Sequence, residues 1–344
     1  MASLPTRFTD RFGCQYPFAA AGMAFAAETP ELAIAVSAAG GVGSIGVGFV
    51  QPEPLRAVIH AVRQAVGDAP FNVNFITAFD NDGQLQVCAE ERVPVVSFHW
   101  GHPAPRQLAP LHEAGVSVWE QVGTVADGVR ATDDGVEVII AQGWEAGGHN
   151  YGGLPTFVQV PQLRDALADT LLLASGGVVD GRGVAAALAL GADGVWVGTR
   201  LLASPEANVH PEHHRRLLAA DGTDTVRSGI FGPEMPAFNP MRLQRNRVVA
   251  EWTDRLDEVP TDRSDQPEIG RTVFGSQEHV KLRFDVLLPV PQTTGDFEEM
   301  PWLMGQGVGM VREVKPAGQI VAEMMGDAHR ILTRLAGALP TGQP

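Results

Sequence analysis

Eight short runs of apolar residues recur along the chain, and segments with helical character separate them. The runs cover residues 17–23, 42–48, 71–77, 93–99, 117–122, 136–142, 170–175 and 194–197. Their starts lie roughly 20 to 35 residues apart, which is about the length of one strand followed by one helix. Eight such units predict an α/β protein with a (β/α)8 barrel, the TIM-barrel fold. A doubly wound open sheet is the weaker alternative.

Helix signals lie between these runs. Thr29 and Pro30 have the order of an N-cap residue followed by proline at the first helical position. Gly191 provides a stop for the helix that precedes it. The further helices expected from apolar stripes cover residues 52–66, 105–113 and 181–190.

The strand–helix rhythm stops after the eighth run. Residues 207–304 mix charged residues and prolines, which predicts a small inserted domain or lid near the barrel mouth. Residues 1–206 are then the barrel, and residues 305–344 return to it. Within that last segment, residues 316–339 have the apolar stripe of an amphipathic helix, formed by Ile320, Met324, Met325, Ile331, Leu332 and Leu335.

Charge and cysteine content narrow the class of protein. The formal net charge of −15 argues against nucleic acid or an anionic membrane as a partner. Cys14 and Cys88 are too few for a disulfide framework. The first residues lack a basic-then-apolar signal pattern, and no segment reads as membrane-spanning. We therefore expect a cytoplasmic protein.

The stretch VEVIIAQGWEAGGH at residues 136–149 joins a buried strand to residues that could carry chemistry. Gln142 places an amide at the end of the strand, and Gly143, Gly147 and Gly148 predict a flexible loop with accessible backbone N–H groups. His149 ends the stretch with a side chain whose ordinary pKa is near neutrality. The alternative is a tight connection that leaves His149 exposed to solvent.

Glycines also follow the seventh and eighth runs. Gly176 and Gly177 follow the seventh, and Gly198 and Thr199 follow the eighth. In barrels of this kind these two positions form a common phosphate site, although both could simply be tight turns. The glycine stretch that ends at His149 contains no GxGxxG fingerprint and no GxxxxGK(S/T) loop, so it supports neither nucleotide-binding motif.

Two groups of histidines could suggest a metal site. His210, His213 and His214 lie close together, but in a charged segment that opens a surface helix. The other group is His99, His102 and His149, which could meet at the barrel mouth. That group lacks an Asp or Glu from another strand end, so no metal is expected.

The chain resembles the nitronate monooxygenases, which are FMN-dependent (β/α)8 enzymes. The resemblance rests mainly on AQGWEAGGH at 141–149 and on ASGGVVDGRGVAAALALGADGVWVGTR at 174–200. It implies that His149 is the catalytic base. The residues that it implies for FMN are Gly22, Met23, Asn74, Gln142, Gly147, Gly148, Gly176, Gly177, Trp196, Val197, Gly198 and Thr199.

The resemblance also implies a reaction. A nitronate, the anion of a nitroalkane, would be oxidised with O₂ to a carbonyl compound and nitrite. The alternative within the same group of barrels is an NAD(P)H-dependent reductase of enoyl thioesters or quinones. A flavin-free phosphate-binding barrel is the alternative from another class. The sequence leaves the physiological substrate and the oligomeric state open, with a homodimer as one option.

Overall fold

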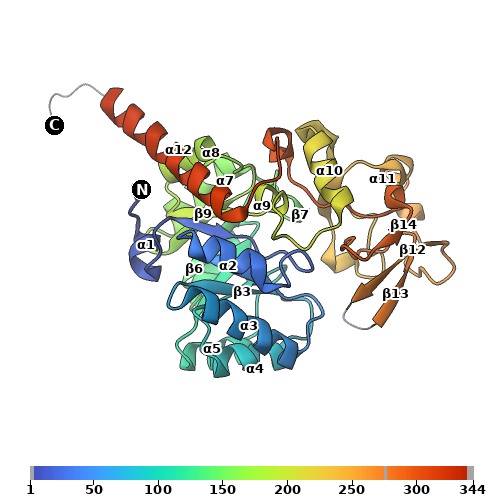
Figure 1. Cartoon of the computed structure of the whole chain (residues 1–344), viewed down its shortest axis with the longest axis horizontal. Coiled ribbons are helices and arrows are strands. Elements are labelled where there is room, and N and C mark those ends of the chain that lie inside the picture. The colour runs from blue at the N-terminus through green and yellow to red at the C-terminus, as the bar shows by residue number, and fades with distance from the viewer. Residues whose placement is uncertain (1–3, 275–276, 339–344) are drawn as a thin grey trace.

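The computed structural model describes residues 4–274 and 277–338. Eight parallel strands form one sheet in the order β1-β9-β8-β6-β5-β4-β3-β2. A single parallel bridge between Ala19 and Val42 joins its two outer strands, so the sheet nearly closes into a barrel (Figure 1). All eight predicted strands and the barrel are thus confirmed. The strands are β1 (Phe18–Ala20), β2 (Gly43–Gly46), β3 (Phe71–Ile76), β4 (Val95–His99), β5 (Ser117–Val122), β6 (Val138–Gln142), β8 (Leu171–Ser175) and β9 (Gly194–Val197).

Side chains alternate across the barrel wall, because successive residues of a strand point to opposite faces. Trp119, Ile140, Leu173 and Trp196 pack together in the barrel interior. The residues between them along the strands join the larger apolar layer beneath the helices. Both faces are therefore covered, which explains why the strands read as continuous apolar runs in the sequence.

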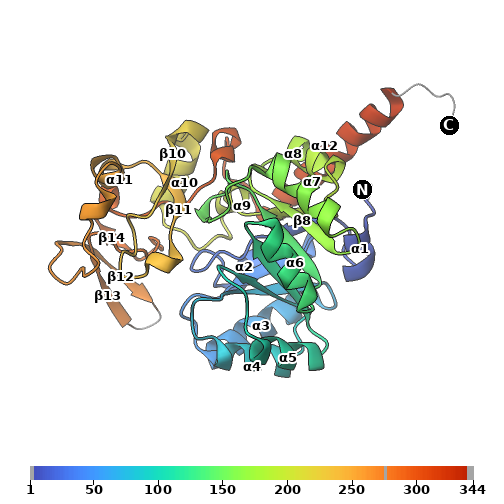
Figure 2. The same cartoon turned by 180° about the vertical axis from the view of Figure 1, so that it is seen from behind.

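Helices surround the barrel (Figures 1 and 2). Those that follow the strands in order are α2 (Pro30–Ala38), α3 (Pro52–Val66), α4 (Asp82–Glu90), α5 (Pro105–Glu113), α6 (Val125–Asp133), α7 (Thr156–Ala166), α8 (Gly181–Ala189) and the short α9 (Thr199–Leu202). The N-terminal helix α1 (Arg7–Phe12) closes the opposite end of the barrel from the loops described below. There Phe8 and Phe12 contact Trp119 with ring centroids 5.5 and 5.0 Å away.

The C-terminal helix α12 (Ala317–Ala338) packs against α8 and α2 and so takes the eighth helical position of the barrel. Its apolar stripe is buried only as far as Ala328. Beyond that residue the helix extends past the barrel (Figure 1), and Leu335 is 56% exposed. The predicted stripe is thus partly wrong at its end, and the predicted last residue, Leu339, lies outside the described residues.

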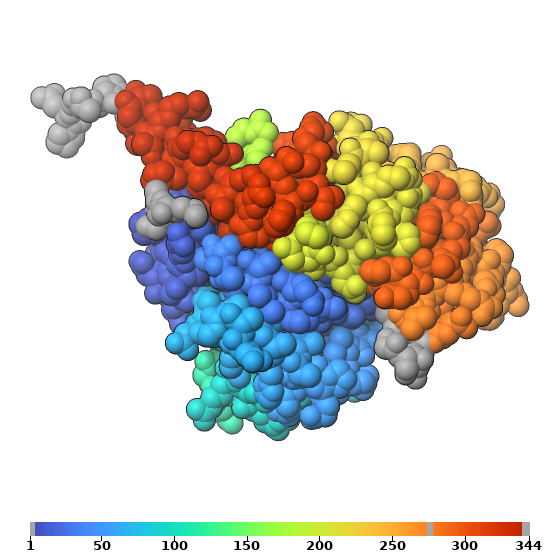
Figure 3. Space-filling view, viewed as in Figure 1, coloured from blue at the N-terminus to red at the C-terminus, as the bar shows by residue number. Residues whose placement is uncertain are grey.

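The segment between β9 and α12 forms a second lobe beside the barrel (Figure 3). It contains two small antiparallel sheets, with strand orders β10-β11-β7 and β13-β12-β14. Its strands and helices are α10 (Pro211–Ala219), β10 (Thr225–Ser228), β11 (Met241–Gln244), α11 (Arg247–Trp252), β12 (Glu268–Phe274), β13 (Gln277–Leu282) and β14 (Thr294–Gly295). Short 3₁₀ helices cover Gly222–Asp224, Pro236–Phe238, Leu256–Glu258, Phe297–Glu299 and Gln306–Met310. The domain boundaries at 206/207 and 304/305 stay a prediction.

One strand connects the two lobes. β7 (Gly148–His149) belongs to the loop after β6, yet it pairs with β11 of the insertion. Within the described residues, no helix is both long and apolar enough to cross a bilayer.

Candidate functional site

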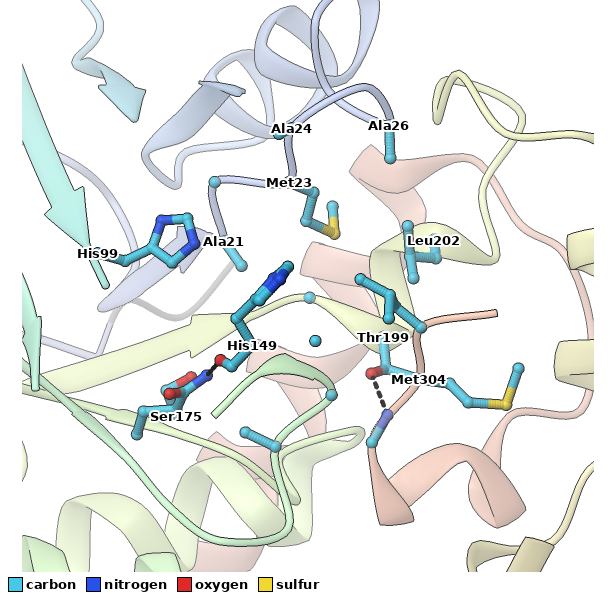
Figure 4. A pocket seen from close by; sticks show the side chains of 18 of the residues that line it. Ala21, Met23, Ala24, Ala26, His99, His149, Ser175, Thr199, Leu202 and Met304 are labelled. Carbon is cyan, nitrogen blue, oxygen red and sulfur yellow. Dashed lines mark hydrogen bonds between the residues drawn. The ribbon is translucent and has the colours of Figure 1, made fainter. Parts of the chain in front are cut away.

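A cavity of about 260 Å³ opens at the carboxyl ends of the barrel strands (Figure 4). Strand-end loops form its inner wall, and residues 235–238, 286–288 and 303–307 cover it from the other side. The predicted site residues that line it are Gly22, Met23, Gln142, Gly147, Gly148, His149, Gly176, Gly177, Trp196, Gly198 and Thr199. The fold therefore brings these strand-end residues together, although they are far apart in the sequence.

Two predicted residues do not line the cavity. Val197 points outward from β9 into the layer beneath the helices. Asn74 is buried, and its Nδ2 donates to the Ser97 hydroxyl at 2.7 Å. Its side chain lies directly behind Gly22, where an added Cβ would stand 1.9 Å from the Asn74 Cγ. Asn74 thus supports the loop after β1 from behind in this structure.

The loop of residues 143–149 is held by hydrogen bonds from neighbouring side chains. The Asn150 Nδ2 donates to the carbonyl oxygens of Gly143, Trp144 and Ala146 at 2.9, 3.0 and 3.2 Å. The Glu145 carboxylate accepts from the Thr156 backbone N–H at 3.1 Å. These bonds satisfy carbonyl oxygens of a turn that has few regular backbone partners. The glycines at 143 and 147 allow neighbouring atoms to pack closely against the turn.

His149 is positioned from both lobes. Its backbone pairs with Met241 of β11, and its carbonyl accepts from the Gln142 Nε2 at 2.9 Å. The ring lies against Phe238, with centroids 3.7 Å apart, and meets the edge of Trp100 at 5.5 Å. Its Nε2 is buried and has no hydrogen-bond partner in the protein.

The apolar surroundings change the acid–base behaviour of His149. His149 lines the cavity, but burial, together with a smaller contribution from the charge of His99, lowers its pKa to about 3. The expectation of a pKa near neutrality was therefore wrong for this environment, because a charged imidazole loses its hydration there. At neutral pH the side chain is the uncharged imidazole.

His99 is a second histidine of the same cavity, at the end of β4. Burial lowers its pKa to about 4, opposed by a hydrogen bond to the backbone of Phe75. Its Nδ1 is buried without a partner. The sequence placed His99 at a strand end but assigned it no binding role.

The other histidines are occupied elsewhere. Nε2 of His213 and of His214 hydrogen-bond to the carbonyl oxygens of Leu303 and Leu202. His102 lies between the carboxylates of Glu120 and Asp134. Across residues 4–274 and 277–338, no group of three or more His, Cys, Asp or Glu side chains could hold a metal ion.

His213 should make folding stability sensitive to acid. Burial lowers its pKa to about 4, whereas in the unfolded chain it is near 6.5. The unfolded chain thus binds more protons between these values, so stability falls as pH drops, by up to about 1.4 kcal/mol per pH unit for this group. We expect His213→Gln to reduce the slope of unfolding free energy against pH by about one proton between roughly pH 6 and 4.5. Urea unfolding at several pH values measures this, and equal slopes in both proteins would contradict it.

Aromatic side chains form a continuous wall from the surface to His149. Phe49 is 51% exposed and lies 5.9 Å from Phe79, which lies 5.6 Å from Phe238. Phe238 in turn stacks on His149, and Phe25 contacts Phe49 at 5.4 Å. These residues come from loops and from the insertion. Their roles were missed because loop residues carry no periodic pattern that assigns them to a site.

The lining suits a planar cofactor with a phosphate tail. Gly176 and Gly177 have φ values of +108° and +71°, and both lie on the cavity wall after β8. Gly198 lies close to Met23 across the loop after β1, since its added Cβ would be 3.6 Å from the Met23 Sδ. These turns leave backbone N–H groups close to the cavity without side chains to screen them. FMN therefore fits the residues present.

Comparisons with known proteins agree with this geometry. A family model described as nitronate monooxygenase matches residues 6–83 and 76–327. The nitronate monooxygenase npaC of Metarhizium robertsii is 31% identical, covering 90% of this chain and 90% of that protein. FabK from Thermotoga maritima has a TM-score of 0.80 and 33% identity, covering 98% of this chain and all of that one. A nitroalkane oxidase from Streptomyces ansochromogenes has a TM-score of 0.76 and 26% identity, covering 95% of this chain and 99% of that one.

Proposed function

The chain belongs to the nitronate monooxygenase family of flavin-dependent oxidoreductases, and we propose that it uses FMN and O₂ to oxidise nitronates to carbonyl compounds and nitrite. One observation carries this proposal. The cavity wall holds an uncharged imidazole, His149, whose Nε2 has no partner, beside glycine turns that suit a flavin phosphate. We further propose that the protein acts in the cytoplasm, as its reduced cysteines suggest.

Several residues would hold the cofactor. Gly176, Gly177, Gly198 and Thr199 would bind the phosphate through backbone N–H groups and the Thr199 hydroxyl. The loops at 22–23 and 147–148 would lie along the ring system. When bound, FMN would supply the electron transfer and the reaction with O₂.

His149 would act as a base toward neutral nitroalkanes. Its low pKa keeps the ring unprotonated at neutral pH, so it is ready to accept a proton from the carbon next to the nitro group. The product of that step is an imidazolium beside a nitronate anion. In a cavity of low polarity these opposite charges attract strongly, which offsets the weak intrinsic basicity of the ring. Phe238 and Trp100 would keep the ring in place and exclude water.

The absorption spectrum of the purified protein tests the proposal. We expect a flavin spectrum that bleaches when ethyl nitronate is added without oxygen and recovers when air is admitted. Nitrite should be released in the aerobic reaction. A protein without flavin, or one whose flavin stays oxidised with nitronate, would refute the proposed function.

A reductase is the second candidate, supported by the similarity to FabK, an enoyl reductase. Rapid anaerobic bleaching by NADH or NADPH, without bleaching by nitronate, would favour it.

The aromatic wall favours nitronates with a long apolar chain. Phe49→Ala removes the outermost ring, and burying such a ring is worth about 1–2 kcal/mol in contact with an alkyl chain. We expect kcat/KM for 1-nitrooctane nitronate to fall about tenfold while that for ethyl nitronate changes less than about twofold. Phe157→Ala is the matched control, because Phe157 is 68% exposed on α7 and does not line the cavity. If Phe49→Ala affected both substrates equally, contact between the alkyl chain and the aromatic wall would be contradicted.

A further inference from the structure

The cavity that would receive an anionic nitronate has no fixed positive charge. Within the part of the chain that the structure describes, its lining includes no Lys, Arg, Asp or Glu side chain. The titratable side chains of the lining are His99 and His149. An anion placed among these apolar walls would lose its hydration without a compensating charge, which is unfavourable unless a proton comes with it.

The charged and titratable groups near these histidines are turned to other partners. The Arg242 guanidinium, on the strand beside His149, donates to the Trp144 carbonyl at 3.0 Å. The Tyr151 hydroxyl donates to Asp127 at 3.4 Å, and the Glu145 carboxylate binds the Thr156 N–H. On β5, beside His99, the buried Glu120 carboxylate lies 2.7 Å from the His102 Nδ1, and Asn74 and Gln121 on the neighbouring strands are uncharged. His99 and His149 are therefore the two side chains of the lining that can hold the proton.

His99 and His149 are suited to hold it together. Each has a buried ring nitrogen without a partner, Nδ1 in His99 and Nε2 in His149. The hydrogen bond from His99 to the Phe75 backbone favours the protonated ring, so the nitrogen opposite Nδ1 donates it. In the neutral ring Nδ1 is then an acceptor. The two rings are close enough for the charge of one to affect the other, and Figure 4 shows both at the cavity.

We propose that His99 is a second positioning residue for the substrate head group, and that an anionic head group enters this cavity together with one proton, held by the His99–His149 pair. The inference rests on the proposed function in that the anion is taken to be a nitronate. It extends that function by giving the site a neutral resting state and a charged bound state. The charged bound state also arises when His149 deprotonates a neutral nitroalkane. Nitroalkanes and nitronates would therefore reach the same bound state.

Nitrite is a suitable probe, because it is a small planar anion that needs no turnover to bind. Calorimetric titration of the FMN-loaded protein in phosphate and in Tris, buffers with different ionisation enthalpies, gives the number of protons taken up. We expect about one proton per nitrite at about pH 7.5, and a Kd that rises about tenfold per pH unit above neutrality. His99→Gln should weaken nitrite binding by at least about tenfold while the flavin stays bound. His60→Gln, at an exposed position on α3, is the control and should bind nitrite normally.

Two results would overturn the inference. One is a proton count near zero in the native protein, and the other is unchanged nitrite affinity in His99→Gln. If that variant does not fold, His99→Asn replaces it, and the proton count of the native protein decides by itself. Nitrite binding with a proton in a protein that does not oxidise nitronates would refute the proposed function and leave this inference standing. If the protein oxidises nitronates but binds nitrite without taking up a proton, the proposed function stands and this inference is refuted.

Discussion

Replacing His149 with Asn is expected to abolish turnover of neutral nitroalkanes and to leave oxidation of preformed nitronates largely intact. Deprotonation of the carbon is the step that needs a base, and a positioned base contributes about 10²- to 10⁴-fold. A preformed nitronate has already lost this proton. We therefore expect kcat for nitroethane to fall by about a thousandfold, while kcat for ethyl nitronate changes by less than about tenfold. Oxygen consumption and nitrite release measure both rates.

The comparison between the two substrates is the control for His149→Asn. The introduced amide would keep a polar group between Phe238 and the cavity, so a general disturbance of the site should affect both substrates equally. An equal loss for nitroethane and ethyl nitronate would contradict the role of His149 as a base. A lower affinity for ethyl nitronate at unchanged kcat would not, because it is the effect expected from a lost partner of the anion.

The barrel could be predicted because its signal is repeated. Each buried strand is a short apolar run, and each follows the last at the spacing of one strand–helix unit. The strand β7 could not be predicted, since Gly148–His149 is too short for any periodic pattern and exists only through its pairing with β11. The predicted burial at the end of α12 was wrong for a related reason. Its apolar stripe continues in the sequence to Leu335, but the barrel that would cover it ends earlier.

The site was predictable where chemistry coincides with strand ends. His149, Gln142 and Gly177 follow buried strands, and parallel strands bring their ends to one edge. The pKa of His149 was not predictable, because burial lowers it, and the ring is packed against Phe238, which the insertion supplies from far along the chain. Asn74 shows that a position at a strand end does not by itself place a side chain in the cavity. It lies at a strand end as predicted, yet its side chain packs against Gly22 and does not line the cavity.

Gly147→Ala is expected to have the largest effect on cofactor binding. An added Cβ at this position would stand 2.5 Å from the Gly305 nitrogen and from the Met304 carbonyl carbon, closer than real Cβ contacts allow. Both are backbone atoms, so the loop and the segment at 304–305 must move apart. The Gly305 N–H donates to the Thr199 hydroxyl at 3.0 Å, and the Gln306 N–H donates to the Glu145 carbonyl at 3.0 Å. Movement would strain both bonds at the wall that would hold the flavin.

Such overpacking costs about 1–3 kcal/mol, so FMN affinity should fall about tenfold to a hundredfold. Quenching of FMN fluorescence on addition of flavin-depleted protein measures the Kd. Gly153→Ala adds the same atoms further along the chain, where nothing lies within 4 Å, and should bind FMN like the native protein. The pair separates the close contact at Gly147 from any general effect of adding a methyl group. Equal FMN affinity in the two variants would mean that the contact between residues 147 and 304–305 does not shape the flavin site.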